Sequence, residues 1–126
     1  MTVRATLAGN VTSSMAVMAF TNAAPSLVGA ASAVAGATGG APAATLTTTR
    51  DSSLVIGVGV DFAAPRVMTP GADQTIVYQA NPSGGTYWVQ QSGTVGVAGT
   101  SVTVGATYGT PAPDPWNLAL IEIRRP

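Results

Sequence analysis

The chain has 126 residues, carries a formal net charge of zero and contains no histidine, cysteine or lysine. In enzymes these three residue types supply most general bases, the strongest nucleophiles, the Schiff-base amines and the transition-metal ligands. We therefore expect no catalytic activity, no metal centre and no cofactor. The composition favours a binding protein or a structural protein over an enzyme.

Charge and hydropathy also limit the partners. A neutral chain lacks the basic patch with which proteins attract nucleic acid or an anionic membrane. The N-terminus has no basic stretch followed by an apolar one, so we expect no Sec-type signal peptide. Every apolar run is interrupted before it reaches the roughly 20 residues that a membrane helix needs. We expect a soluble chain with no nucleic-acid partner and no membrane partner, in a compartment that the lack of cysteine leaves open.

The first two predicted elements are strands. Residues 2–8 alternate apolar side chains with threonine and arginine, and Gly9-Asn10 supplies a turn. Residues 14–21 carry apolar side chains on both faces, which is typical of a central strand that is covered on both sides.

The next segment changes composition. Residues 22–44 consist almost entirely of Ala, Gly, Ser, Pro and Thr, and they lack large apolar anchors. A short helix over residues 30–35 has support from alanine propensity, but flanking glycines limit its length. We expect a long Ala/Gly-rich surface loop over residues 22–44. Long loops are often functional, and a plain connection between two sheets is the alternative.

The rest of the chain again has the alternation and turn residues of a β-protein. In residues 53–61, Gly57 and Gly59 share one face, where another backbone or a ring can approach closely. Residues 81–85 have the composition of a hairpin turn. The expected strands cover residues 45–49, 53–61, 74–80, 86–91, 99–105 and 116–123.

Together the elements predict the fold class. About eight short strands separated by Gly/Pro turns, with no helical period, favour an all-β, two-sheet antiparallel β-sandwich of jelly-roll type over a barrel or an α/β fold. Residues 1–126 have the length of a single domain with a core of its own.

The acidic residues give little sign of chemistry. The four aspartates fall at strand ends or in loops, where calcium ligands gather, but their spacing matches no EF-hand, and turn or cap roles are the better explanation. Glu122 is the sole glutamate, whereas a glycosidase needs two opposed carboxyls. We expect Glu122 to form an ion pair with Arg124 or another arginine.

The aromatic residues are the strongest candidates for binding. Tyr87 and Trp88 are adjacent in a predicted strand, so they point to opposite faces and one of them is expected at a surface or interface. An exposed ring beside amide side chains is a platform on which a sugar could stack. The alternative is that both rings cap the two sides of the sandwich or lie in a subunit contact. The candidate binding residues are Tyr87, Trp88, Gln90, Asn81, Tyr108 and Trp116.

Four segments together carry a resemblance to a known domain: residues 14–20, 51–59, 86–90 and 116–123. They resemble the C-terminal half of an Ala/Gly/Thr-rich β-sandwich domain of actinobacterial surface proteins and of minor tail and other virion proteins of actinobacteriophages. The resemblance covers residues 3–123 and consists of strand patterns, so it transfers no functional residue. In that family further strands usually precede the segment that matches residues 2–8.

The resemblance implies a non-catalytic structural virion protein of a bacteriophage, either a capsid decoration protein or a tail-associated module, acting by surface complementarity. Its partners would be other virion subunits or further copies of itself, because a sandwich without its usual first strands leaves edges for a neighbour to cover. The alternative is an extracellular carbohydrate-binding module that uses Trp88 or Tyr87 to bind a cell-surface glycan. The expected location is the virion or the extracellular space.

Overall fold

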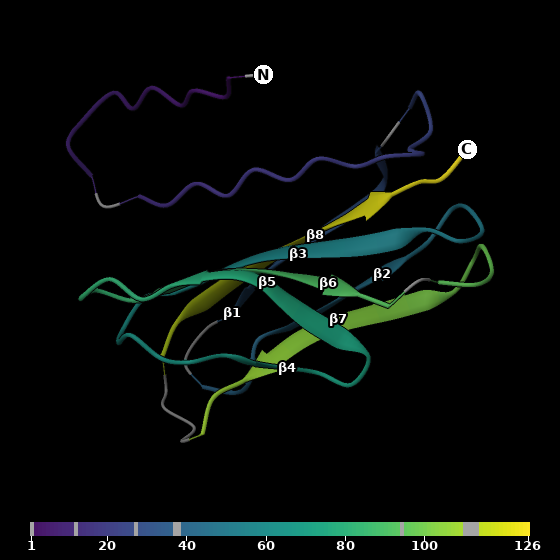
Figure 1. The fold of residues 1–126 in the computed structure, drawn as a ribbon. Helices are drawn as coiled ribbons and strands as arrows, with labels where there is room; N and C mark the ends of the chain where they lie inside the picture. The colour runs from purple at the N-terminus through teal and green to yellow at the C-terminus, as the bar shows by residue number, and fades with distance from the viewer. Residues whose placement is uncertain (1, 12, 27, 37–38, 94, 110–113) are drawn as a thin grey trace.

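The computed structural model describes residues 2–11, 13–26, 28–36, 39–93, 95–109 and 114–126. These residues form eight strands and no helix, and the strands make two antiparallel sheets that pack face to face (Figure 1). The expected all-β sandwich is therefore confirmed. Among the described residues there is no helix with the length and hydropathy that crossing a membrane requires. The strands are β1 (Val28–Gly36), β2 (Ala43–Thr47), β3 (Leu54–Asp61), β4 (Thr69–Pro70), β5 (Gln74–Ala80), β6 (Thr86–Ser92), β7 (Ser101–Thr107) and β8 (Trp116–Ile123).

The strand order is that of a jelly roll with one displaced strand. The larger sheet has the order β1-β8-β3-β6-β5, and the smaller sheet has the order β2-β7-β4. Strands β1 to β4 thus alternate between the two sheets, as they do in a jelly roll. Strand β5 pairs with β6 in the larger sheet instead of extending the smaller one beyond β4.

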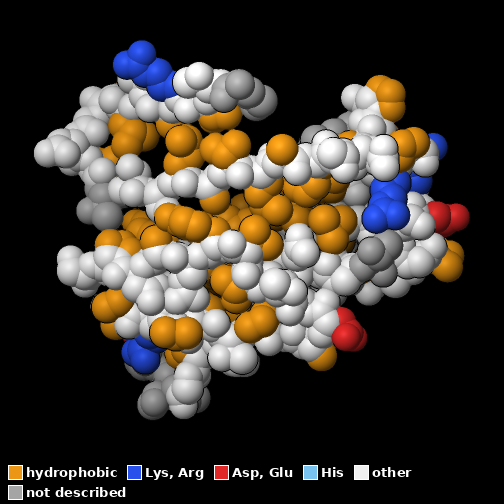
Figure 2. All heavy atoms as spheres, in the orientation of Figure 1, with side chains coloured by type: hydrophobic (Ala, Val, Ile, Leu, Met, Phe, Trp, Pro, Cys, Tyr) orange, Lys and Arg blue, Asp and Glu red, His pale blue; other side chains and the backbone are white. Residues whose placement is uncertain are grey.

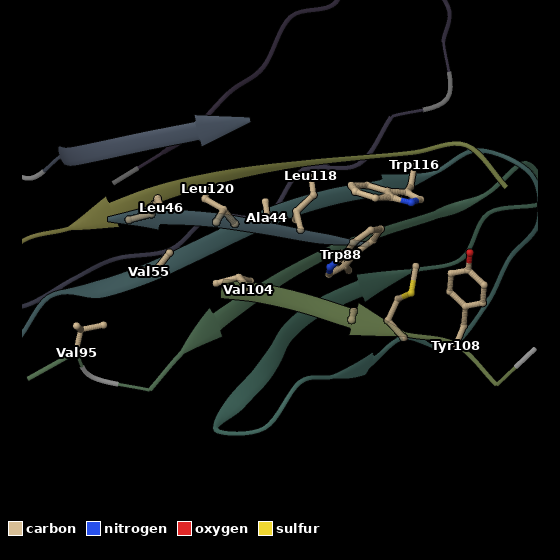
Figure 3. Packing of buried hydrophobic residues seen from close by; sticks show 12 residues of the cluster. Ala44, Leu46, Val55, Trp88, Val95, Val104, Tyr108, Trp116, Leu118 and Leu120 are labelled. Atoms are coloured by element: carbon tan, nitrogen blue, oxygen red, sulfur yellow. The ribbon is translucent and has the colours of Figure 1, made fainter. Parts of the chain in front are cut away.

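The core fills the space between the two sheets. Alternate residues of β2 and β8 are buried there, which is the period of two that the sequence predicts for strands with one covered face. Figure 3 shows Trp88, Val104 and Leu118 pointing into this space from β6, β7 and β8. The buried members of the cluster are Ala44, Leu46, Val55, Met68, Trp88, Val95, Val104, Ala106, Tyr108, Trp116, Leu118 and Leu120.

The two N-terminal strand predictions are wrong. Residues 2–11 and 13–23, here called the N-terminal arm, are extended but belong to neither sheet. Figure 1 shows the arm as two legs above the larger sheet: the first leg is residues 2–11, and the second leg is residues 13–23. Alternation specifies an extended backbone, but a strand also needs a free edge to pair with. The second leg crosses the face of the larger sheet instead of joining an edge.

The prediction of a loop over residues 22–44 is also wrong. Strand β1 occupies Val28–Gly36 in this segment and pairs with β8 along its length. Alanine and glycine have low intrinsic strand propensity, so these residues carry no strand signal. Pairing with the buried strand β8 outweighs that propensity. Strand β4 likewise lies outside the expected strands, and it has two residues.

The predicted close approach at Gly59 is confirmed. The Trp88 ring lies against this glycine, and a Cβ at position 59 would overlap the ring. We expect Gly59→Ala to lower the free energy of unfolding by ~1–3 kcal/mol, because an overpacked core must shift its side chains or backbone. Urea unfolding measures the difference.

Gly96→Ala is the matched control, since a Cβ at position 96 meets no atom within 4 Å. It should leave stability unchanged or raise it by ~0.5 kcal/mol through the lower entropy of the unfolded chain. Equal effects of the two substitutions would contradict this role of Gly59.

Candidate functional site

Two of the predicted binding residues form part of a buried hydrogen-bond network. Trp88 and Gln90 are 1% and 0% exposed, and the indole Nε1 of Trp88 donates to Oε1 of Gln90 at 2.7 Å. Nε2 of Gln90 donates to Oε1 of Gln74 at 2.7 Å and to the carbonyl of Gly105 at 3.0 Å. Oε1 of Gln74 also accepts from the Gly105 amide at 3.1 Å. These groups satisfy one another inside the sandwich, so the predicted sugar platform cannot include Trp88 or Gln90.

Tyr108 and Trp116 also lie in the core rather than at a surface (Figure 3). The guanidinium of Arg66 lies 5.0 Å from the centroid of the Tyr108 ring and forms a salt bridge of 3.0 Å with Asp114. Burial raises the pKa of Tyr108, Asp61 and Asp114 raise it further, and Arg66 opposes them. Arg66 therefore makes a cation–π contact with Tyr108 and an ion pair with Asp114 at this end of the sandwich.

Tyr87 and Asn81 are the two predicted residues that remain at the surface. Tyr87 is half-buried and belongs to the opposite face of β6 from Trp88, as the alternation predicts. Asn81 is exposed and accepts a hydrogen bond of 2.9 Å from Nε2 of Gln79. The six candidates are thus divided between the core and two separate surface positions, and they do not form one site.

Tyr87 belongs to a surface that we call the outer face, the side of the larger sheet that points away from the smaller sheet. On this face Val58 lies opposite Val89 and Ala119, and Val60 lies opposite Tyr87 and Asn117. A second apolar cluster covers part of the same face. Its members are Ile56, Val89 and Ile123, with Met18, Phe20, Leu54, Tyr78 and Ile121 partly buried against them.

Two adjoining hollows indent the outer face, and together we call them the apolar groove. The first, of about 270 Å³, lies between Met15 of the N-terminal arm and strands β3, β5 and β6. The second, of about 460 Å³, extends over β8 to β1 and is lined by Asn117 and Ala119. Val58 and Tyr87 line both hollows. Figure 2 shows hydrophobic side chains on both sides of the opening between the arm and the body.

The sequence did contain a signal for this groove. Residues 54–60 are apolar or glycine at every position, which is typical of a strand whose two faces are both covered. One face of β3 meets the smaller sheet, and over the other face the described residues place the N-terminal arm. Val58 therefore remains 53% exposed in the centre of a sheet.

The predicted ion pair of Glu122 is wrong. Its carboxylate is fully buried and accepts five hydrogen bonds from the described residues, with no arginine side chain among these donors. Arg124 instead donates to the carbonyl and hydroxyl oxygens of Ser26, at 2.7 and 2.6 Å. The donors to Glu122 are the backbone amides of Ala30, Thr49 and Arg50, at 2.8, 2.8 and 3.2 Å, and the hydroxyls of Thr49 and Ser53, each at 2.7 Å.

These donors set the acidity of Glu122. Burial alone would raise the pKa of the carboxyl, but the hydrogen bonds from Ala30, Thr49 and Ser53 outweigh burial and lower it from 4.5 to about 2. The carboxylate stays ionised in the folded protein because more than one donor faces each oxygen. No atom of it is exposed to a ligand, so its role is structural.

The aspartates have the contacts of loop and turn residues. Asp51 accepts from the Ala98 amide at 2.7 Å, Asp61 accepts from the Ala63 amide at 3.1 Å, and Asp73 has a left-handed φ of 57°. Within the described part of the chain, no three acidic, histidine or cysteine side chains gather as a metal site.

Comparison with known proteins identifies a relative in fold. No protein-family model matches the sequence, and no curated protein matches it. Among solved structures, the chain is similar to one in the tripod (BppUct-A-L) from the baseplate of bacteriophage Tuc2009, with a TM-score of 0.50 and 17% sequence identity. The alignment covers 99% of this chain and 79% of that chain. At this identity the likeness establishes a shared fold, and the resemblance to actinobacterial domains stays a prediction.

The pKa of Glu122 predicts how stability depends on pH. Because the folded pKa lies below the unfolded one, the contribution is complete above about pH 4.5 and is lost as the pH falls towards about 2. A depression of this size corresponds to ~3 kcal/mol of unfolding free energy. Urea unfolding over this pH range should show the loss.

We expect Glu122→Gln to weaken this acid dependence and to lower stability at neutral pH by ~2–4 kcal/mol, because the new amide group must face N–H and O–H donors. Asp51→Asn is the matched control, since that carboxylate is exposed. An acid profile of Glu122→Gln identical to that of the wild type would contradict the assignment.

Proposed function

We propose that the chain is a non-catalytic structural protein of a bacteriophage virion, in its tail or baseplate, and that it acts by surface complementarity. The main support for this proposal is that the chain, over 99% of its length, shares its fold with a chain of a phage baseplate tripod. That neighbour favours a tail-associated module over a capsid decoration protein. The location is the virion, and the partners are other virion subunits or further copies of this chain.

The surface of the molecule supports this function. The apolar groove and the N-terminal arm present valine, leucine and methionine side chains to solvent, and extended apolar surface on a folded domain is typical of a protein–protein contact. The residues that line the larger hollow on the outer face are uncharged: Val58, Val60, Tyr87, Asn117 and Ala119. A contact made there depends on shape and apolar burial rather than on charge.

The described side chains also support a function without chemistry. Ser53 and Glu122 place a hydroxyl 2.7 Å from a carboxylate, which is the beginning of a nucleophile–base pair. Both residues are 0% exposed, and Glu122 is held ionised by its other donors. A substrate has no path to this pair, and the sequence has no histidine to relay a proton.

A glycan is the second candidate partner, and one observation favours it. The Tyr87 ring lines both hollows of the groove, and the amide of Asn117 lines the larger one, so an aromatic ring and an amide face the same concave surface. Without Trp88, this platform has one ring. We rank the glycan below the virion role for that reason.

Purified phage particles test the first proposal. Quantitative mass spectrometry should find the chain at a fixed ratio to the other tail proteins, and antibody labelling in electron microscopy should place it on the tail. A protein absent from washed particles, or present at a variable ratio, would contradict the virion role. Labelling on the capsid would contradict the tail assignment.

A glycan array separates the two candidates. We expect the wild-type chain and Tyr87→Ala to give the same signal, at background. A specific glycan signal that Tyr87→Ala abolishes, in a variant with an unchanged urea midpoint, would replace the first proposal by the second.

A further inference from the structure

Most of the exposed large apolar residues in the described part of the chain lie on the N-terminal arm or on the outer face beneath it. Five of them lie on the N-terminal arm and are between 42% and 62% exposed, although their spacing is that of a strand. Others lie on the larger sheet, with Val58 at the centre of the apolar groove. The arm residues are Val3, Leu7, Val11, Met15 and Val17.

The arm is held to its own sheet by one leg only. The hydroxyls of Ser14 and Tyr78 lie 2.8 Å apart, and Met18 and Phe20 pack on the apolar cluster of the outer face. Met15 and Val17 alternate with these contacts and remain exposed. Among the described residues, the backbone of residues 2–11 and 13–23 has no hydrogen-bonded strand partner. The arm is therefore an unpaired extended segment with apolar side chains.

The arm does not fill the groove beneath it. The first hollow, of about 270 Å³, remains between Met15 and the sheet, and the second, of about 460 Å³, lies beyond the arm residues over β3 and β8. The groove is lined without a charged side chain, and Arg4 is the one charged residue among residues 2–23. The occupant that fits this groove is therefore an uncharged, apolar, extended segment.

We propose that the apolar groove binds the N-terminal arm of a second copy of this chain. The arm has the required chemistry, since it is extended, alternating and almost uncharged. A two-fold exchange buries both surfaces of both copies at once, which is the self-complementary geometry of an isologous interface. It also lets the two arms pair with each other as antiparallel strands between the two outer faces. Met18 and Phe20 already show that this face accepts apolar arm residues.

The inference rests on the proposed function in that it specifies one of the partners named there. Its test uses the purified chain with no phage particle, so a failed dimer assay would leave the virion role standing. By size-exclusion chromatography with light scattering, the wild-type chain should form a dimer. Val58→Glu places a charge in the groove and should raise the dissociation constant at least ~100-fold, because that charge would be buried without a partner. Val97→Glu is the matched control, because Val97 is 66% exposed and lines neither hollow, and it should leave the dimer unchanged.

Removal of residues 2–11 should have the same effect as Val58→Glu, and urea midpoints should show that both variants stay folded. A wild-type chain that is monomeric at all accessible concentrations would overturn the proposal. So would a dimer that survives both Val58→Glu and removal of residues 2–11.

Cross-linking tests the contact itself. The natural chain has no cysteine, so Leu7→Cys and Val58→Cys each carry a single thiol. A short bis-maleimide added to a mixture of the two variants should link one copy of each, and a mixture of Leu7→Cys with Val97→Cys should give no such product. Equal yields from the two mixtures would overturn the exchange of arms.

Discussion

The buried carboxylate of Glu122 connects three segments of the sandwich that are far apart in the sequence. It lies on β8, and it accepts hydrogen bonds from Ala30 of β1 and from Thr49, Arg50 and Ser53 between β2 and β3. One anion thus joins β8 and its neighbour β1 to the connection between β2 and β3, which links the two sheets. The absence of a side chain at Gly29 is part of the arrangement, because a Cβ there would overlap the carboxylate. The buried anion is stable here because backbone and hydroxyl dipoles surround it.

The strands differ in how much of their position could be predicted from the sequence. Six strands from β2 to β8 could be predicted, because their apolar residues alternate between turns that contain Gly or Pro. Strand β1 could not, since its alanines and glycines carry no strand signal and its place depends on pairing with β8 and on the amide of Ala30. The arm shows the opposite error. Residues 2–8 and 14–21 have a strand pattern, but a pattern does not supply an edge to pair with.

The candidate site was predicted in part, for a similar physical reason. Alternation placed Tyr87 and Trp88 on opposite faces, but it did not determine which ring would face the smaller sheet. That choice is made by Gly59 on β3, which lies opposite Trp88 in the register and leaves the space that the indole fills. The hydrogen-bond partners of Gln90 also could not be predicted from the sequence, because Gln74 and Gly105 lie on other strands. Local spacing predicts the face of a side chain, and tertiary packing decides what that face meets.

The amide network around Gln90 gives the sandwich a mechanical property that its apolar core lacks. Apolar contacts are non-directional, so on their own they resist separation of two sheets better than they resist sliding. Gln90 on β6 and Gln74 on β5 bond to both backbone groups of Gly105 on β7, across the interface between the sheets. Because hydrogen bonds lose strength steeply when their geometry changes, this cross-link opposes shear. A force that slides the larger sheet is therefore transmitted to the smaller sheet at Gly105.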